Sequence, residues 1–265
     1  MADTDFTANP EEAKDRNFIT ALARGLDILR CFRPNEVELS NLDISHRTGL
    51  PKPTVSRLTY TLCKLNYLVV NSRTGTYRLG AGVLQLGFGV LSGMEIGERA
   101  AYEMRDLCSG PNPYITCALG EQHRLDMVYV AVQRSNEDVS LTMHVGSRLP
   151  LFFSAIGRSV LVAMSDQDRE AAFQLGYSES PELETDRQNS YAQAVREYEA
   201  TGYCTGYGDW RRDVNGIAAP VFSLNRSRVY GLNIGGPSFH VKKRQLESHY
   251  ARKLVAAASS LSFQH

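Results

Sequence analysis

The sequence predicts an α+β protein with two parts, an N-terminal winged helix-turn-helix domain and a C-terminal α+β domain. Three observations favour this fold class. A short helix, a tight turn and a polar-faced helix follow one another and lead into a basic hairpin. The chain has no net formal charge, yet residues 40–80 contain six basic residues and only one acid, Asp43. Beyond that segment, stretches of strand periodicity alternate with stretches of helical periodicity.

The composition limits the class of protein. With 265 residues, 43% of them hydrophobic and 22% charged, the chain is long enough for two soluble domains. Residues 1–17 are polar and lack the apolar core of a signal peptide, so we expect a disordered tail there. No apolar run reaches the roughly 18–20 residues that a membrane span needs, so we expect a cytoplasmic protein that does not engage a membrane.

The cysteines and histidines do not indicate a metal site. The five cysteines contain no Cys-x-x-Cys pair, and the six histidines are scattered singly. Reduced, mostly buried thiols are therefore favoured over a disulfide framework or a zinc site. We expect no metal and no cofactor.

The first two helices precede a tight turn. We expect helix one at residues 20–32, with an apolar stripe that packs inward. That stripe consists of Leu22, Leu26, Leu29 and Phe32. Helix two is expected at 41–48 with Ser40 or Asn41 as its N-cap, followed by the turn Gly49-Leu50-Pro51.

The third helix, expected to open at Pro53, carries the candidate nucleic-acid contacts. Its apolar positions Val55, Leu58, Leu62 and Leu65 should pack inward. The other face offers cations and hydroxyls for phosphates and an arginine able to bind guanine bidentately. Together with neighbouring basic residues, the candidate DNA contacts are Arg47, Lys52, Thr54, Ser56, Arg57, Tyr60, Lys64, Arg73 and Arg78.

A hairpin follows the third helix. Residues 67–70 and 76–79 read as two strands, and the loop 71–75 places Arg73 at the tip. A three-helix packing unit with a merely solvated polar face is the alternative. The four-part order and the local positive charge favour a winged helix-turn-helix domain over residues 18–80.

The next segment, 81–93, is expected to be a linker helix. Its apolar residues Val83, Leu84, Leu86, Phe88, Val90 and Leu91 lie on nearly all sides. Such a helix must be buried, so we expect it to pack in a dimer. A phosphate-binding glycine loop at Gly80-Ala-Gly82 is excluded, because Gln85 stands where the third glycine would be needed.

Residues 94–265 are expected to form an effector-binding and oligomerisation domain with a sheet of about five or six strands. Strands are expected at 114–119, 125–134, 139–145, 217–222 and 229–234. Helices are expected at 96–108, 155–164, 167–175 and 188–201, with a last helix that buries Leu246, Tyr250, Leu254 and Leu261.

Several motifs resemble the isocitrate lyase regulator (IclR) family of bacterial transcription factors, over residues 18–262. They are Arg24-Gly-Leu-Asp-Ile-Leu, Thr48-Gly-Leu-Pro-Lys-Pro-Thr-Val-Ser-Arg57, Tyr77-Arg-Leu-Gly80, Gly146-Ser-Arg-Leu-Pro-Leu, Ser154-Ala-Ile-Gly157, Gly202-Tyr203, Ile217-Ala-Ala-Pro220 and Gly235-Gly-Pro237. The resemblance implies a dimer or tetramer that binds an operator in double-stranded DNA. It also implies a GAF-like effector domain and control of a catabolic operon.

The resemblance further implies an effector pocket. The matching positions are Leu141, Met143, Ala155, Ile156, Gly206, Gly216, Asn233 and Gly235. A cysteine and two serines that bind small keto acids in one branch of the family correspond here to Gly216, Asn233 and Gly235, which disfavours a keto acid such as glyoxylate.

The residues themselves suggest a larger organic acid, with an aromatic acid favoured. The glycines should leave room for a ring beside Trp210, and Arg211 or Arg212 could receive its carboxylate. We expect Gly235→Leu to abolish the effector response without changing DNA affinity. In the alternative interpretation, the glycines serve turns and strand crossings. Trp210 then only packs against its neighbours, and Arg211 and Arg212 are solvated on a loop.

An enzyme is the rival class. The chain has no Gly-x-Ser-x-Gly motif, Ser154 lacks a glycine frame, and paired acids for proton transfer are not recognisable. An architectural DNA binder would not need the long C-terminal part. We therefore predict a regulator that is not an enzyme.

Overall fold

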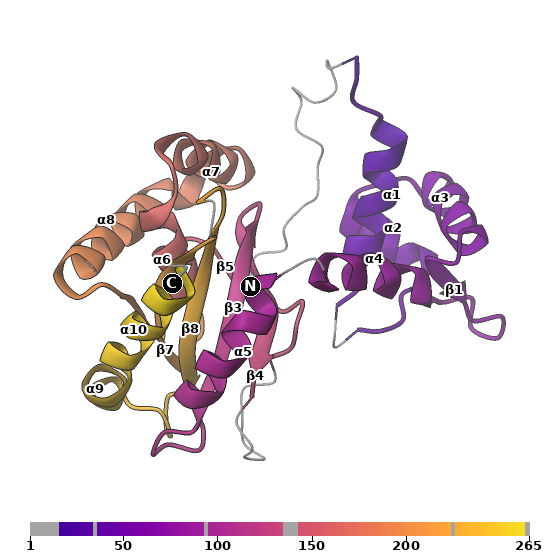
Figure 1. Ribbon diagram of the computed structural model, residues 1–265. Coiled ribbons are helices and arrows are strands. Elements are labelled where there is room, and N and C mark those ends of the chain that lie inside the picture. The colour runs from indigo at the N-terminus through magenta and orange to yellow at the C-terminus, as the bar shows by residue number, and fades with distance from the viewer. Residues whose placement is uncertain (1–15, 34–35, 93–94, 135–142, 224–225, 263–265) are drawn as a thin grey trace. The chain divides into compact units, whose positions relative to one another are not determined.

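The computed structural model describes residues 16–33, 36–92, 95–134, 143–223 and 226–262 (Figure 1). The chain divides into two compact units, residues 1–93 and 94–265. An N-terminal helical unit and an α+β unit confirm the predicted fold class. The tail expected at 1–17 lies almost entirely outside the described residues.

The first unit is a helix-turn-helix followed by a two-stranded wing. Its elements are α1 (Thr20–Arg30), α2 (Asn41–Thr48), α3 (Lys52–Lys64), β1 (Leu68–Val70), β2 (Tyr77–Leu79) and α4 (Ala81–Ser92). Strands β1 and β2 pair antiparallel. The small core between the helices and the wing contains Ile28, Cys31, Leu39, Ile44, Val55 and Leu68.

Local sequence signals set the geometry of the helix-turn-helix. Ser40 caps α2, because its Oγ accepts from the backbone N–H of Asp43 at 3.2 Å. The Asp43 carboxylate accepts in return from the Ser40 N–H at 2.8 Å, which completes a capping box. Gly49 ends the helix with φ +67°, a left-handed conformation that glycine adopts without steric cost. Helix α3 then begins at Lys52, one residue before the expected Pro53.

Two expected apolar stripes are wrong in part. Leu22 and Leu26 of α1 are 61% and 45% exposed, whereas Ile28 is fully buried. At the end of α3, Leu65 is 58% exposed, whereas Thr59 is fully buried and donates its hydroxyl to the Val55 carbonyl at 2.9 Å. A hydroxyl that bonds within its own helix can be buried at little cost, so polarity alone is a poor guide to the buried face of a short helix.

The second unit contains a six-stranded antiparallel sheet in the order β5-β4-β3-β8-β7-β6. Its strands are β3 (Thr116–His123), β4 (Asp126–Gln133), β5 (Arg148–Pro150), β6 (Cys204–Tyr207), β7 (Val214–Phe222) and β8 (Val229–Pro237). Its helical segments are α5 (Glu95–Cys108), α6 (Ala155–Ala163), α7 (Asp166–Glu179), η2 (Pro181–Leu183), α8 (Glu184–Thr201), α9 (Lys243–Gln245), η3 (Leu246–Tyr250) and α10 (Ala251–Ser262).

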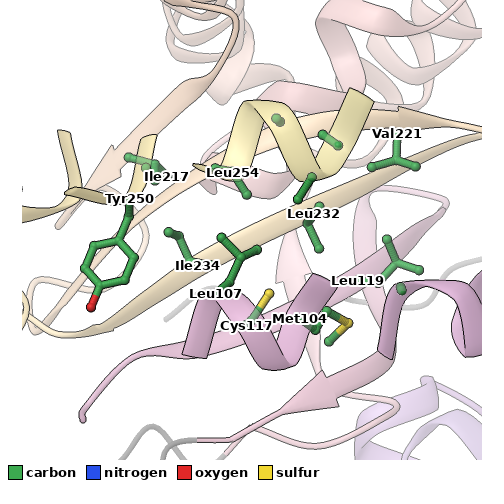
Figure 2. Close-up of a cluster of buried hydrophobic side chains, with 14 of the residues drawn as sticks. Met104, Leu107, Cys117, Leu119, Ile217, Val221, Leu232, Ile234, Tyr250 and Leu254 are labelled. Atoms are coloured by element: carbon green, nitrogen blue, oxygen red, sulfur yellow. The ribbon is translucent and has the colours of Figure 1, made fainter. Parts of the chain in front are cut away.

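Helices cover both faces of the sheet (Figure 1). Cys117 and Leu119 of β3 point to the cluster formed with α5 and α10, and Ala118 between them points to the cluster formed with α6. Figure 2 shows side chains from α5, α10 and the central strands in the first of these clusters. Because both faces are covered, the central strands β7 and β8 are apolar at most positions.

The expected strand at 139–145 is not seen as such. Residues 139–142 lie outside the described part, and Met143 and His144 are irregular. They lead into a turn in which Ser147 N–H donates to the His144 carbonyl at 2.9 Å and Gly146 has φ +87°. The edge strands β5 and β6 were not expected, because three- and four-residue strands are too short for alternation to be recognised.

Candidate nucleic-acid interface and small-molecule cavity

Helix α3 exposes the polar face that the sequence predicts. Lys52, Ser56, Arg57, Tyr60 and Lys64 are exposed, and Thr54 is half-buried in the first turn. The Lys64 ammonium lies 5.5 Å from the centroid of the Tyr60 ring. The Asn41 amide donates to Ser56 Oγ at 3.0 Å and so ties the start of α2 to α3. With Val55 and Thr59 in the core, this face points away from the unit's interior.

The wing presents two further cations. Arg73 is exposed in the β1–β2 turn, and Arg78 is exposed on β2. The turn is closed by Asn71, whose backbone exchanges hydrogen bonds with Thr76 and Gly75 at 2.8 Å each and whose side chain accepts from the Arg73 N–H at 3.1 Å. Arg73 is thereby held at the tip of the wing.

Arg47 differs from the other candidate contacts. Its guanidinium donates to the Cys31 carbonyl at 2.9 Å and to the Glu36 carboxylate at 2.7 Å, and the side chain is only 26% exposed. These bonds tie α2 to the end of α1, so its charge is already paired inside the unit. The candidate nucleic-acid interface therefore consists of the other eight residues.

The second unit holds a small cavity between the sheet and α6, with a volume of about 30 Å³. Eight of the ten expected pocket residues line it: Met143, Ala155, Ile156, Gly206, Trp210, Gly216, Asn233 and Gly235. Sequence reasoning missed five others: Thr116, Tyr129, Leu149, Val214 and Asn215. Leu141 lies outside the described residues. The missed residues come from neighbouring strands, which only the sheet order brings together.

The N-terminus of α6 lies at this cavity. Ser154 is the N-cap: its Oγ accepts from the Gly157 N–H at 3.1 Å and donates to the Pro150 carbonyl at 2.7 Å. Ala155 and Ile156, which line the cavity, belong to the first turn, whose N–H groups have no partner within the helix. Since the Ser154 hydroxyl is used in capping, its role here is structural.

The three glycines of the cavity wall do not create room for a ring, and that expectation is wrong. A Cβ on Gly235 would lie 2.5 Å from the Asn215 carbonyl oxygen, and one on Gly206 would lie 2.9 Å from the Ala155 nitrogen. On Gly216 the Cβ would meet the Ile234 oxygen at 3.1 Å. These glycines allow close approach of backbone to backbone. Gly235→Leu would therefore disturb the β7–β8 pairing and is unsuitable as a probe of the cavity.

One wall of the cavity is polar. Tyr129 of β4 is buried, and it lines the cavity together with Asn233 of β8. Burial raises the pKa of Tyr129 far above its usual value, so the phenol is neutral. Nearby, the Asn215 amide donates to the Val241 carbonyl at 2.9 Å.

Arg211 does not line the cavity, contrary to expectation. It is exposed and donates to the Asp213 carboxylate from Nε at 3.0 Å and from Nη2 at 2.5 Å. This hydrogen-bonded pair raises the pKa of Arg211 and lowers the pKa of Asp213. The Arg211 guanidinium also lies 5.5 Å from the Trp210 ring. Its charge is satisfied within the loop.

A buried cation that the sequence reasoning missed lies one turn into α6. Arg158 donates to the Asp209 carboxylate and the Thr205 carbonyl at 2.9 Å each, and to Ser190 Oγ at 2.8 Å. Only 5% of its side chain is exposed, against 37% for Asp209. A single arginine within the otherwise apolar stretch Ala155–Ala163 was the available signal, because a buried charge needs a partner.

No group of three or more His, Cys, Asp or Glu side chains that could hold a metal ion is found in the described residues. Within the same part of the chain, no helix is long and apolar enough to cross a membrane.

Comparison with protein families matches both units. The family model described as IclR helix-turn-helix domain matches residues 21–72. The model described as Bacterial transcriptional regulator IclR C-terminal matches residues 88–263. The second match alone covers more than half of the chain.

Individual relatives agree. The HTH-type transcriptional regulator TsaQ1/TsaQ2 of Comamonas testosteroni is 33% identical over 83% of this chain and 79% of its own length. The Pca regulon regulatory protein of Pseudomonas putida is 28% identical over 94% of this chain and 85% of its own.

Solved structures share the fold. An IclR family transcriptional regulator from Brucella abortus has a TM-score of 0.83 and 38% identity, covering 99% of this chain and 98% of that one. An IclR homologue from Microbacterium hydrocarbonoxydans, complexed with 4-hydroxybenzoate, has a TM-score of 0.67 and 22% identity, covering 91% and 97%. The helix-turn-helix, the cavity-bearing α+β unit and these matches agree, and the chain belongs to the IclR family of DNA-binding transcription regulators.

Proposed function

We propose that this regulator binds a two-fold operator as a dimer or a dimer of dimers and responds to a small organic acid, an aromatic acid being favoured. The controlled genes are those of a catabolic operon, and the protein acts in the cytoplasm. The observation that carries the proposal is the cavity at the N-terminus of α6, in a chain whose α3 exposes a cationic face.

DNA recognition is assigned to α3 and the wing. Arg57, exposed in the middle of the face, suits a guanine edge, which accepts two parallel N–H bonds. Lys52 and Lys64 flank it and suit phosphates, as does Arg73 at the wing tip. Because cations that neutralise phosphates release counterions from DNA, the affinity for DNA should fall steeply as the salt concentration rises.

Dimerisation is assigned to exposed apolar side chains of the first unit. On α4, Leu84 is 75% and Phe88 67% exposed, and both line a groove with Leu65 and Tyr67. Contiguous apolar surface of this kind marks an interaction site. A second copy of the chain is the favoured occupant, because two-fold regulators read half-sites about 10 base pairs apart or a multiple of that.

The acid is assigned to the cavity of the second unit. Its carboxylate would meet the first-turn N–H groups of α6, where the helix dipole favours an anion. The apolar wall from Met143, Leu149, Ile156 and Val214 suits a ring. The Microbacterium homologue, which shares the fold, is complexed with an acid of this kind, 4-hydroxybenzoate.

The cavity must open to admit such a ligand. Its volume of about 30 Å³ is far below the roughly 150 Å³ of an engineered cavity that binds benzene. Two wall residues lie outside regular elements, Trp210 in the turn between β6 and β7 and Met143 in the irregular segment before β5. We assign opening to the 208–213 loop, which carries Trp210.

The test is operator binding by the full chain, followed by fluorescence anisotropy, with and without a panel of aliphatic and aromatic acids. We expect operator binding to depend on salt. One class of acid should change the operator affinity by about 5–150-fold, the usual size of allosteric coupling. The same acids should raise the melting temperature, since a ligand selective for the native state stabilises it. Operator binding that no acid alters would contradict the effector assignment.

A further inference from the structure

Besides its apolar lining, the cavity has a polar part that includes two side chains of the sheet. Tyr129 comes from β4 and is 3% exposed, and Asn233 comes from β8. Asn233 follows Gly231 by two residues on the same face of β8, about 7 Å along the strand. Gly231 in turn packs against Ile156 in the first turn of α6. Asn233 therefore lies further along β8 than the glycine that faces the start of α6.

Tyr129 and Asn233 both line the cavity. The Asn233 side chain has two polar ends, an amide group that donates hydrogen bonds and a carbonyl oxygen that accepts them.

That carbonyl oxygen, Asn233 Oδ1, is buried and has no hydrogen-bond partner among the described residues. A buried acceptor without a partner is unfavourable, and few exist in folded proteins. The Asn215 amide, at the same cavity, has a protein partner in the Val241 carbonyl. Among the described residues that line the cavity, Asn233 has the buried side-chain acceptor without a hydrogen-bond partner, Oδ1, so a ligand can satisfy it.

We propose that the effector carries a hydroxyl group besides its carboxylate, and that this hydroxyl donates to Asn233 Oδ1. The inference rests on the proposed function, in which an acid occupies this cavity. The carboxylate lies at the α6 N-terminus and the hydroxyl lies further along β8. A site that hydrogen-bonds a substrate hydroxyl discriminates strongly against the analogue that lacks it, because the buried acceptor is then left unpaired.

The experiment is calorimetry on the full chain with matched acids. Benzoate, the three hydroxybenzoates and the three methoxybenzoates form the aromatic series, and butyrate with 3-hydroxybutyrate forms an aliphatic pair. A methoxy group keeps the oxygen but has no proton to donate, so it separates hydrogen-bond donation from size and polarity. We expect at least one hydroxy acid to bind about tenfold or more tighter than its methoxy and unsubstituted counterparts.

Asn233→Leu, which keeps the size of the side chain and removes the acceptor, should bring the affinity of the hydroxy acid within about twofold of its methoxy counterpart. Its melting temperature and its operator affinity without acid provide the folding controls. If the variant does not fold, the comparison of acids on the wild-type chain still decides.

The possible failures are distinguishable. Equal binding of hydroxy, methoxy and unsubstituted acids overturns the inference but leaves the acid effector in place. A preference for the hydroxy acid that persists in a folded Asn233→Leu variant has the same consequence. Absence of binding by every acid in the panel overturns both the inference and the effector assignment.

Discussion

Arg47 and Arg57 belong to the same basic segment, but their guanidinium groups have different surroundings. Arg47 is paired with Glu36 and the Cys31 carbonyl, whereas Arg57 is exposed on α3. A count of formal charge along the sequence does not distinguish these two arginines. Only the exposed cation is available to DNA without breaking an interaction of the folded unit.

Arg57→Ala should weaken operator binding by about 1–3 kcal/mol and relax specificity at one base pair, because a bidentate base contact is lost. Lys52→Ala should weaken all sequences alike and reduce the slope of log affinity against log salt by about 1. Anisotropy titrations over a salt series, with the operator and single-base variants, measure both effects.

Arg47→Ala is the matched control for these two variants. It should lower the melting temperature, because Glu36 and the Cys31 carbonyl lose their partner, and it should leave the salt slope unchanged. If the variant instead showed a smaller slope of log affinity against log salt at unchanged stability, Arg47 would be a DNA contact.

At the scale of elements, the loop between β6 and β7 connects a buried ion pair to the cavity wall. Asp209 accepts from Arg158 in α6, and the next residue, Trp210, lines the cavity. Tyr207 N–H also donates to the Asp209 carboxylate at 3.3 Å, so one carboxylate orders the start of the loop. The loop conformation thus depends on a charge that α6 holds in the interior.

Asp209→Asn should destabilise the second unit by about 1–3 kcal/mol. This is less than the 3–5 kcal/mol of a fully buried pair because Asp209 is 37% exposed. Trp210 is the only tryptophan of the chain, so its fluorescence reports on the loop. We expect red-shifted emission and altered acid affinity, measured by thermal unfolding and emission spectra.

Asp213→Asn serves as the control within the same loop. Its partner Arg211 is exposed, and exposed pairs contribute about 0–1 kcal/mol. Emission that is the same for Asp209→Asn and Asp213→Asn would argue against the positioning of Trp210 by the buried pair.

The cap of α2 gives a second prediction at this scale. Ser40→Ala removes the acceptor of the Asp43 N–H and should cost about 0.5–2 kcal/mol of unfolding free energy. Denaturant titration of the wild type and variant measures the change. Ser72→Ala, in the exposed wing turn, should stay within about 0.5 kcal/mol, and equal losses in the two variants would speak against the capping box.

At the scale of the whole molecule, the exposed apolar side chains of the first unit bear on assembly. On α1, Ile19, Leu22 and Leu26 form an exposed stripe, and α4 exposes Leu84, Leu86 and Phe88. Two unpartnered apolar helix faces in one small unit favour association over a monomer.

Phe88→Glu should convert the dimer into monomers at micromolar concentration and weaken operator affinity by about 100-fold or more, since avidity across two half-sites is lost. Light scattering and anisotropy measure the two effects. Phe239→Glu, at an exposed aromatic position of the second unit (57%, against 67% for Phe88), is the control. A monomeric wild type, or a dimeric Phe88→Glu variant, would contradict the assignment of the interface.

The sequence alone determined the elements whose signals are local. The Ser40 cap, the left-handed Gly49 and the polar face of α3 follow from residues within one or two turns of each other. The strands expected at 125–134, 217–222 and 229–234 correspond to β4, β7 and β8, and the resemblance to the IclR family led to seven of the cavity residues.

Tertiary structure alone decided which charges and polar groups are satisfied. The pairs Arg47–Glu36 and Arg158–Asp209 join residues 11 and 51 positions apart, and Tyr129 and Asn233 meet at the cavity from two different strands. The glycines of the cavity wall likewise have their role only because β6 and α6, or β7 and β8, come into contact. Composition and periodicity describe each segment by itself, whereas these contacts depend on the order of strands and on the packing of helices upon them.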